Sequence, residues 1–238
     1  QLNASDSFKE MFFVIIQLRA ILAVLTSFWK KMFPFQFKDK SQPIIKKEIF
    51  SLWFKVVVAC IPGAIITLLF DDYIEANFHT PIVIATTLII YGIGFIIVEN
   101  WNKMRIPSIT NLNEITYKTA WLIGLFQVLS IIPGTSRSGA TIIGALIIGV
   151  SRVAAAEFTF FLAVPVMFGL STLKILKFGF VFTASELFIL ILGMAVAFIV
   201  SVAVIKFLMS FIKKHDFKAF GWYRIVLGIA VILITTII

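Results

Sequence analysis

The chain has 238 residues, of which 60% are hydrophobic and 14% charged, and its mean hydropathy is +1.03. Soluble domains carry roughly 45–50% apolar and about 25% charged residues. This composition indicates an integral membrane protein and excludes a secreted disulfide scaffold, a disordered tail and a soluble nucleic-acid binder. The net charge of +9 is typical of basic cytoplasmic loops and does not indicate a nucleic-acid partner.

Apolar runs are the main signal along the chain. About 20 residues with a rise of about 1.5 Å each cross a hydrocarbon core of about 30 Å. We therefore expect an all-α integral membrane protein, a single membrane domain over residues 1–238, with six transmembrane helices. The six runs are Met11–Trp29, Val56–Phe70, Pro81–Val98, Val153–Leu173, Leu187–Met209 and Gly221–Ile238.

A seventh apolar run, Thr119–Val150, is interrupted at its centre by the sequence Pro-Gly-Thr-Ser-Arg-Ser-Gly at 133–139. The two flanking halves, Thr119–Ile132 and Ala140–Val150, are each too short to span a bilayer. Such a segment predicts two half-helices that meet at a turn inside the membrane, which is a re-entrant hairpin over 119–150.

Loop charges test this topology. The loop Lys30–Lys55 carries seven lysines against two acids and should be cytoplasmic, whereas Asp71–Thr80 has three acids and no Lys or Arg and should lie outside. If the interrupted run returns to the side from which it came, the basic segments Glu99–Lys118, Ser151-Arg152 and Lys213–Lys218 are all cytoplasmic. A full crossing would place the last of these outside, so the charges favour the hairpin.

The resulting order of elements indicates an inverted repeat, with a first repeat over 11–98 and a second over 119–238. The second repeat begins with a hairpin and the first does not. By parity, we expect a second hairpin upstream of residue 1. The chain begins at Gln1, and its polar start, Gln1–Glu10, lacks the features of a signal peptide.

One charged residue, Arg137, lies at the apex of the predicted hairpin near the bilayer midplane. An Arg at a helix centre costs about 2.5–3.5 kcal/mol to insert, so it needs a polar cavity and a partner. Gly134 and Gly139 let the backbone turn and approach a ligand, while Ser136 and Ser138 supply hydroxyls that can cap the second half-helix. The positive end of that helix attracts an anion, and a guanidinium can donate two hydrogen bonds to a pair of phosphate oxygens. The segment Thr135 to Ser138 therefore predicts a phosphate-binding cradle in the membrane.

Alternatives to this interpretation stay open. Arg137 can instead pair with Glu157, one turn into the next span, and simply tie helices together. Glu157 can also ligate a metal, act as a base, orient Arg137 or be an interfacial acid. Gln127 can hydrogen-bond a ligand or brace the hairpin, and Arg19, near the middle of the first span, has no assigned partner.

The hairpin sequence Pro-Gly-Thr-Ser-Arg-Ser-Gly-Ala-Thr at 133–141 strongly resembles that of the bacterial undecaprenyl-diphosphate phosphatase, or bacitracin-resistance, family. Three further segments carry the same resemblance, namely Phe13–Leu18, Gly149–Arg152 and Ala156–Pro165. The resemblance covers essentially the whole chain and is most specific around the hairpin.

The resemblance implies an enzyme that hydrolyses undecaprenyl diphosphate to undecaprenyl phosphate and inorganic phosphate, recycling the lipid carrier for peptidoglycan synthesis and giving bacitracin resistance. It implies six spans with two re-entrant hairpins in an inverted repeat. It also implies a multi-pass protein of the bacterial cell membrane with its active site facing outward, and a divalent cation, usually Mg²⁺. A homo-oligomer is compatible with it. The catalytic candidates are Ser136, Arg137 and Ser138; the substrate-binding candidates are Gly134, Thr135, Gly139, Gln127 and Glu157.

Two departures from the family pattern bear on activity. The family's other hairpin, with its glutamate-rich helix and Pro-x-Ser-Ser-x-Gly-His turn, supplies acids, a histidine and a candidate serine nucleophile, and no such sequence precedes Phe8. The nucleophile, the general base and the metal ligands are therefore not assigned, and the activity of the 238-residue chain by itself stays open. In addition, Arg19 replaces the glycine that usually follows Gln17-Leu18.

Two other functions compete with hydrolysis. An inverted-repeat transporter or flippase for the phosphorylated lipid carrier would use the same broken helices, and would move substrate across the membrane without releasing phosphate. A membrane scaffold with a purely structural hairpin would show no affinity for anions and would tolerate Arg137→Gln.

Overall fold

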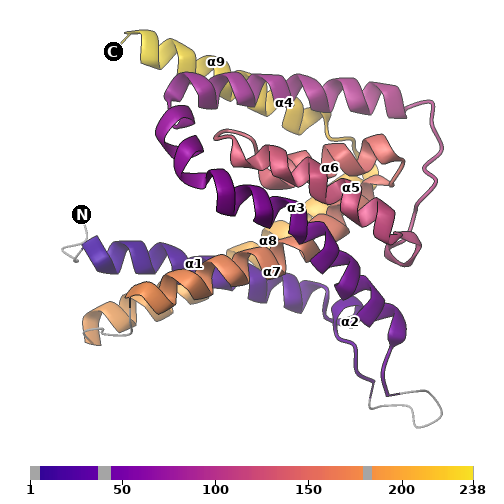
Figure 1. Cartoon of the computed structure of the whole chain (residues 1–238), viewed down its shortest axis with the longest axis horizontal. Coiled ribbons are helices and arrows are strands. Elements are labelled where there is room, and N and C mark those ends of the chain that lie inside the picture. The colour runs from indigo at the N-terminus through magenta and orange to yellow at the C-terminus, as the bar shows by residue number, and fades with distance from the viewer. Residues whose placement is uncertain (1–5, 37–43, 179–183, 238) are drawn as a thin grey trace. The chain divides into compact units, whose positions relative to one another are not determined.

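The computed structural model describes residues 6–36, 44–178 and 184–237 (Figure 1). These residues form an all-α fold, as predicted. In chain order the helices are α1 Asp6–Ser27, α2 Trp29–Met32, α3 Lys47–Phe78, α4 Pro81–Asn102, α5 Tyr117–Val128, α6 Arg137–Ile148, α7 Arg152–Phe178, α8 Ala184–Lys214 and α9 Lys218–Ile237, with the short 3₁₀ turns η1 Leu112–Glu114 and η2 Leu129–Ile131.

Within the described residues, five helices are long and apolar enough to cross a membrane, and they confirm five of the six predicted spans. The first predicted span, Met11–Trp29, overlaps α1. The side chains of α1 are described without a break only over Leu18–Ser27, which is too short for a span, so that prediction stays untested. The five spanning stretches are Lys47–Phe70, Pro81–Asn102, Arg152–Gly169, Glu186–Lys214 and Lys218–Ile237.

Two predicted loops are shorter than expected because α3 extends beyond the predicted span Val56–Phe70 at both ends. It begins at Lys47, inside the predicted loop Lys30–Lys55, and it continues to Phe78, through most of the predicted loop Asp71–Thr80. No Gly or Pro interrupts residues 71–78, so the helix does not end where the charge begins. The real break comes at Thr80, whose hydroxyl accepts a hydrogen bond from the Val83 amide (3.3 Å) and caps α4.

The chain forms two compact units, one of residues 1–49 with 160–210 and one of residues 50–159 with 211–238. These units do not coincide with the predicted repeats, whose symmetry stays a prediction. In the first unit, the Phe28 ring packs 5.8 Å from the Phe160 ring and 5.6 Å from the Phe161 ring. Arg19, in the same unit, has a buried Nε without a hydrogen-bond partner, and nothing in the structure explains this residue.

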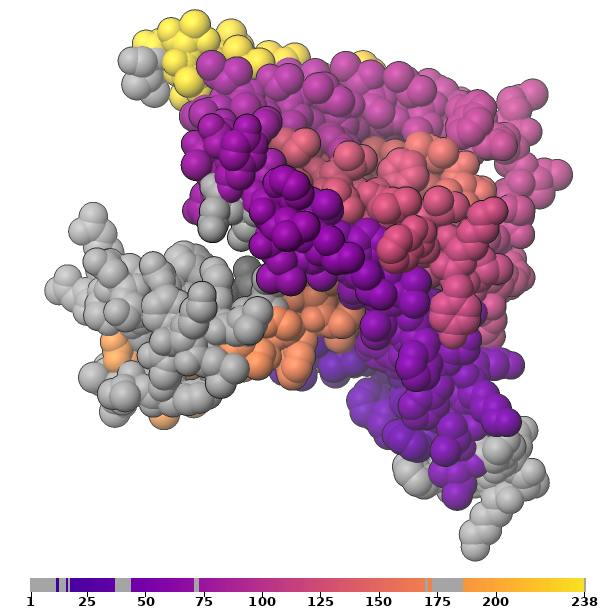
Figure 2. Space-filling model, in the orientation of Figure 1, coloured from indigo at the N-terminus to yellow at the C-terminus, as the bar shows by residue number. Residues whose placement is uncertain are grey.

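The second unit depends on an unusually close approach of α4 and α9, which lie side by side in Figures 1 and 2, where α4 is magenta and α9 yellow. A Cβ at Gly228 would lie 2.7 Å from the Ala85 carbonyl oxygen, and a Cβ at Gly221 would lie 2.7 Å from that of Gly92. Small residues at such interfaces let helix backbones pack closely where lipid offers no hydrophobic driving force.

A buried carboxylate joins three chain segments at one end of this unit. Glu99, near the end of α4, is fully buried. It accepts hydrogen bonds from Arg152 Nε (2.9 and 3.0 Å), from Arg152 Nη2 and from the Phe217 amide (3.0 Å). The end of α4, the start of α7 and the connection between α8 and α9 therefore share one face, as the loop charges predicted.

The chain also enters and leaves the segment between α4 and α7 at a single place. The Ser108 amide donates to the Gly149 carbonyl (2.9 Å), and the Ser151 amide donates to the Ile109 carbonyl (2.8 Å). Since 108–109 precede α5 and 149–151 follow α6, the segment returns to the face from which it started. Residues 119–150 thus form a helical hairpin, as predicted, and not one continuous helix; that this hairpin re-enters the membrane stays a prediction.

Replacing Gly228 by Ala should destabilise the protein by about 1–3 kcal/mol, because the new methyl group overlaps the Ala85 carbonyl oxygen and the Ile89 side chain. The change in the free energy of unfolding is measured by titrating the detergent-solubilised protein with denaturant and monitoring tryptophan fluorescence. Gly169→Ala is the matched control, since no atom of the described residues outside its own helix backbone and its two chain neighbours lies within 4 Å of its added Cβ. Equal midpoints for both variants would contradict the close α4–α9 contact.

Candidate functional site

The turn of the hairpin lies part of the way along α4, one of the helices long and apolar enough to cross a membrane. Its arms, α5 and α6, have 12 residues each, or about 18 Å at 1.5 Å per residue, which is too short to cross. The turn contacts α4 through Thr87, whose hydroxyl donates to the Pro133 carbonyl (2.7 Å). Thr87 follows Pro81 by six residues and precedes Asn102 by fifteen, so the turn lies about 9 Å along α4 from one end and about 22 Å from the other.

Two helices hold the backbone of this turn. Besides the bond from Thr87, Arg224 of α9 donates from Nη2 to the Gly134 carbonyl (2.7 Å). Gly134 has a φ of 85°, and a Cβ there would lie 2.1 Å from the Thr87 hydroxyl oxygen and 2.5 Å from the Ile84 carbonyl oxygen. Only glycine fits this position, and the turn's carbonyls find partners that the lipid could not supply.

The second half-helix starts earlier than predicted. Ser136 caps it by accepting a hydrogen bond from the Gly139 amide (3.3 Å), so α6 begins at Arg137 and not near Ala140. The Ser136 and Ser138 hydroxyls lie 3.1 Å apart. The prediction that Gly139 forms part of the turn is wrong, because Gly139 is inside α6, where its lack of a side chain lets the helix pack against Phe95.

Arg137 is the first residue of α6, and its side chain is exposed. Among the described residues it forms no ion pair and donates no side-chain hydrogen bond, so the predicted alternative of a salt bridge to Glu157 is not found. Glu157 is buried in α7 and has contacts of its own. The guanidinium is thus available to a ligand.

The backbone at the start of α6 offers further donors. The Gly139 amide bonds the Ser136 hydroxyl and the Ala140 amide bonds the Ser136 carbonyl (2.9 Å). The amides of Arg137 and Ser138 precede the first intrahelical bond and have no acceptor of that kind. Together with the positive end of the helix dipole, they form an anion-binding arrangement of the predicted type.

Three buried polar atoms near the hairpin lack hydrogen-bond partners: the Thr135 hydroxyl, Gln127 Oε1 and Arg224 Nε. Such atoms are rare in folded proteins and call for a partner. Gln127 lies against α3, because its Nε2 is 2.7 Å from the position of a Cβ at Gly63. The contact with α3 favours a role for Gln127 in bracing the hairpin. The unpaired Oε1 favours a hydrogen bond to a ligand, so both predicted roles stay open.

Arg224 is the residue that sequence reasoning missed. Its guanidinium carbon lies 5.9 Å from the centre of the Tyr91 ring, and its Nη2 reaches the hairpin turn. The signal was available, since Arg224 interrupts the apolar run Gly221–Ile238 as Arg137 interrupts the hairpin. An arginine in a span calls for an explanation wherever it occurs. The structure thus brings two guanidinium groups to one turn.

The described residues contain no group of three or more His, Cys, Asp or Glu side chains that could hold a metal ion. The site described above is one of cationic and hydroxyl groups. This donor set suits phosphate oxygens, which accept hydrogen bonds, and does not suit a bare cation.

The loop before α5 is held by a carboxylate. Glu114 accepts hydrogen bonds from the amides of Thr110 (2.7 Å) and Asn111 (3.2 Å). The Thr110 bond, with those from Asn111, lowers the pKa of this exposed carboxyl below its usual value. The loop thereby presents the hairpin at a fixed entry point, beside residues 149–151.

Comparison with known proteins matches residues 1–230 to the family described as bacitracin resistance protein BacA. A protein of Enterococcus faecalis named undecaprenyl-diphosphatase is 72% identical over 236 residues, which cover 99% of this chain and 86% of that protein. Proteins of the same name from Desulfitobacterium hafniense and Acetivibrio thermocellus are each 59% identical, over 98% of this chain and 84% and 85% of their own lengths.

Replacing Gly134 by Ala should destabilise the hairpin by at least about 2 kcal/mol, because the residue has a positive φ and its new methyl group would overlap α4. The matched control is Gly139→Ala, where the nearest atom lies 3.3 Å from the added Cβ and the residue is helical. That change should stay within about 1 kcal/mol. Denaturant unfolding of both variants tests the pair, and equal losses would contradict the turn geometry.

Proposed function

The chain belongs to the bacitracin resistance protein BacA family, and we infer that it is an undecaprenyl-diphosphatase. It hydrolyses undecaprenyl diphosphate to undecaprenyl phosphate and inorganic phosphate. The observation that carries this function is an arginine, free of any ion pair in the described chain, at the first position of a half-helix inside the membrane. The names of the relatives favour hydrolysis over transport.

The diphosphate binds at the start of α6. The Arg137 guanidinium offers two parallel N–H donors to a pair of phosphate oxygens, a geometry that a lysine cannot reproduce. The amides of Arg137 and Ser138 and the hydroxyls of Ser136 and Ser138 complete the cradle. Arg224 adds a second positive charge, because its guanidinium lies at the Gly134 carbonyl and keeps a buried Nε without a partner.

Catalysis in this cradle is mainly electrostatic. Hydrolysis transfers the terminal phosphoryl group to water, and negative charge develops on the bridging oxygen and on the phosphoryl oxygens. Fixed donors in a site of low dielectric stabilise that charge without reorganising. The candidate roles of Ser136, Arg137 and Ser138 in catalysis and of Gly134, Thr135, Gly139, Gln127 and Glu157 in binding belong to this proposal, and the group that activates the water stays unassigned.

Magnesium, which the family resemblance implies, belongs to the proposal only in a limited way. Mg²⁺ is commonly held by one or two carboxylates together with substrate phosphates, and it would neutralise phosphate charge when bound. The described residues provide no cluster for it. Arg137 and Arg224 therefore account for the binding of the anion by this part of the chain.

The polyprenyl tail needs an apolar path, and α3 offers one beside Cys60. Val57, Ile61, Ile65 and Leu68 are all exposed and recur every three or four residues, so they form one stripe along the helix. This stripe faces lipid or a lipid-like chain. The tail can follow it while the headgroup contacts Arg137, and the substrate never leaves the bilayer.

The site opens toward the outer face of the bacterial plasma membrane. The turn lies nearer the N-terminal end of α4, which follows the acidic segment Asp71–Glu75, and basic segments surround the opposite end. Positively charged loops mark the cytoplasmic side. Outward opening places hydrolysis on the side where cell-wall synthesis releases the diphosphate carrier.

Arg137→Ala in the natural gene product that contains this chain should lower kcat/KM for undecaprenyl diphosphate by about 10²–10³-fold, as for the loss of a donor to a developing anion. Arg137→Lys should keep only part of the lost kcat/KM, because a lysine supplies the charge without the paired donors. Phosphate release in proteoliposomes measures both. Lys118→Ala, an exposed cation at the start of α5, is the control, and an Arg137→Ala rate equal to that control would refute the assignment.

Arg224 can act by charge or by holding the turn, and two variants separate these roles. Arg224→Lys keeps the charge and Arg224→Gln removes it, while both side chains are shorter than arginine and weaken the bond to the Gly134 carbonyl. We expect kcat/KM to be about tenfold lower in Arg224→Gln than in Arg224→Lys, since a hydrogen bond to a charged group is worth about 1.5–3 kcal/mol. The unfolding midpoints of the two variants should be similar and should both lie below that of the unchanged protein. Equal turnover in the two variants would leave Arg224 with the positioning role alone.

A further inference from the structure

A polar cavity lies at the opposite end of the hairpin from the turn. Its volume is about 590 Å³, within the range of small-molecule sites, and the ends of α4 and α6 and the start of α7 line it, together with the end of α8. The 12 residues of α6 separate it from the turn by about 18 Å. It is therefore not part of the phosphate cradle described above.

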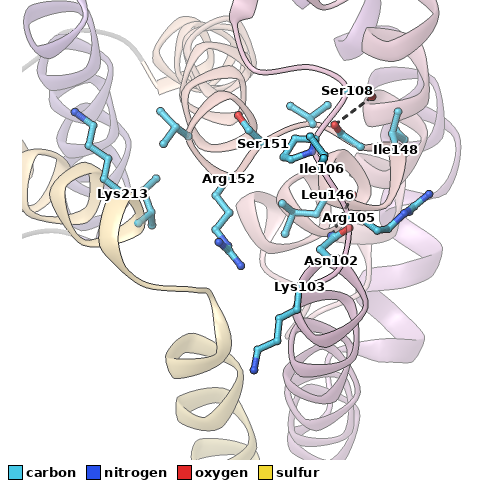
Figure 3. Close-up of a pocket in the computed structure, with 15 residues that line it drawn as sticks. Asn102, Lys103, Arg105, Ile106, Ser108, Leu146, Ile148, Ser151, Arg152 and Lys213 are labelled. Atoms are coloured by element: carbon cyan, nitrogen blue, oxygen red, sulfur yellow. Dashed lines mark hydrogen bonds between the residues drawn. The ribbon is translucent and has the colours of Figure 1, made fainter.

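The lining of this cavity is strongly basic. Four cations line it, Lys103, Arg105, Arg152 and Lys213, and the described residues that form the lining include no acid. Figure 3 shows the side chains of Lys103 and Arg152 extending toward the same opening, while those of Arg105 and Lys213 point away to either side. The nearby Asp216 is already paired, with its carboxylate 3.7 Å from Lys218 Nζ.

Arg152 is held rigidly in this cavity. Its Nε and Nη2 bond the fully buried Glu99, which leaves Nη1 and a side chain that is 37% exposed. A guanidinium fixed in this way loses little conformational entropy when it binds an anion. Lys103 adds a mobile charge from the end of α4.

The rim of the cavity is apolar and exposed, which a site for a soluble ion would not require. Met104 and Ile106 are 93% and 95% exposed, and they alternate with Lys103 and Arg105 along the chain. Trp101, 50% exposed, carries the Arg105 guanidinium 4.0 Å from the centre of its ring. Such alternation of cations with apolar and aromatic side chains at a helix end is typical of the membrane–water interface.

We propose that this cavity binds the headgroup phosphate of an anionic phospholipid from the membrane face opposite the hydrolytic site. Arg152 and Lys103 contact the phosphate oxygens, and Met104 and Ile106 insert among the acyl chains beside it. Basic cavities between membrane helices are known to hold such headgroups. The binding site is independent of the hydrolysis proposed above.

Lys103→Ser should weaken binding of phosphatidylglycerol about fivefold, the value of one basic residue at an anionic surface. Native mass spectrometry of the detergent-solubilised protein, titrated with phosphatidylglycerol and with phosphatidylcholine, measures the occupancy. Lys118→Ser is the matched control, because it removes one exposed lysine near the same face without touching the cavity lining. Arg152 is left unchanged, since its loss would strand the buried charge of Glu99.

Two further experiments identify the source of the phosphate. Excess inorganic phosphate should not displace the lipid, and Met104→Ser with Ile106→Ser should weaken lipid binding as Lys103→Ser does. Displacement by inorganic phosphate would overturn the lipid assignment in favour of a soluble anion. Equal occupancy by the two lipids, or equal effects of Lys103→Ser and Lys118→Ser, would overturn the site itself.

Discussion

A non-helical turn can persist inside a bilayer only if the protein supplies the hydrogen bonds that lipid cannot. In this chain that requirement falls on Pro133 and Gly134. Thr87 of α4 bonds the first carbonyl and Arg224 of α9 bonds the second, each at 2.7 Å. The glycine contacts between α4 and α9 bring these two helices together. Close helix packing, the buried turn and the charge beside it are therefore parts of one arrangement.

The same arrangement explains how an arginine can be kept ready for an anion. Because the turn is bonded to α4 and α9, the start of α6 has a fixed direction, and Arg137 extends from it without an ion pair in the described chain. A salt bridge within the protein would stabilise the charge but would compete with a ligand. At the other end of the hairpin, Glu99 accepts hydrogen bonds from Nε and Nη2 of Arg152, and Nη1 stays available to a ligand.

Sequence patterns predicted much of this fold because the strongest signals were local. Runs of apolar residues located five spans, and the charges of Lys213, Lys214 and Lys218 distinguished a hairpin from a crossing. Helix ends were less accurate, because α3 continues past the apolar run and Ser136 starts α6 before Ala140. The contacts of Glu99 and Arg224 could not be predicted, since each joins residues 53 or more positions apart, and neither pairing leaves a local pattern.

The account depends on a phosphate contact by Arg137, and binding measured without chemistry tests it most directly. A non-hydrolysable methylene analogue of a polyprenyl diphosphate, titrated against the natural gene product in nanodiscs, isolates that contact. We predict that Arg137→Ala lowers the affinity for the analogue by about 10–100-fold, as for the loss of a charged hydrogen-bonding partner, and leaves the affinity for a neutral polyprenyl alcohol unchanged. Equal affinity of the unchanged and Arg137→Ala proteins for the analogue would contradict the account.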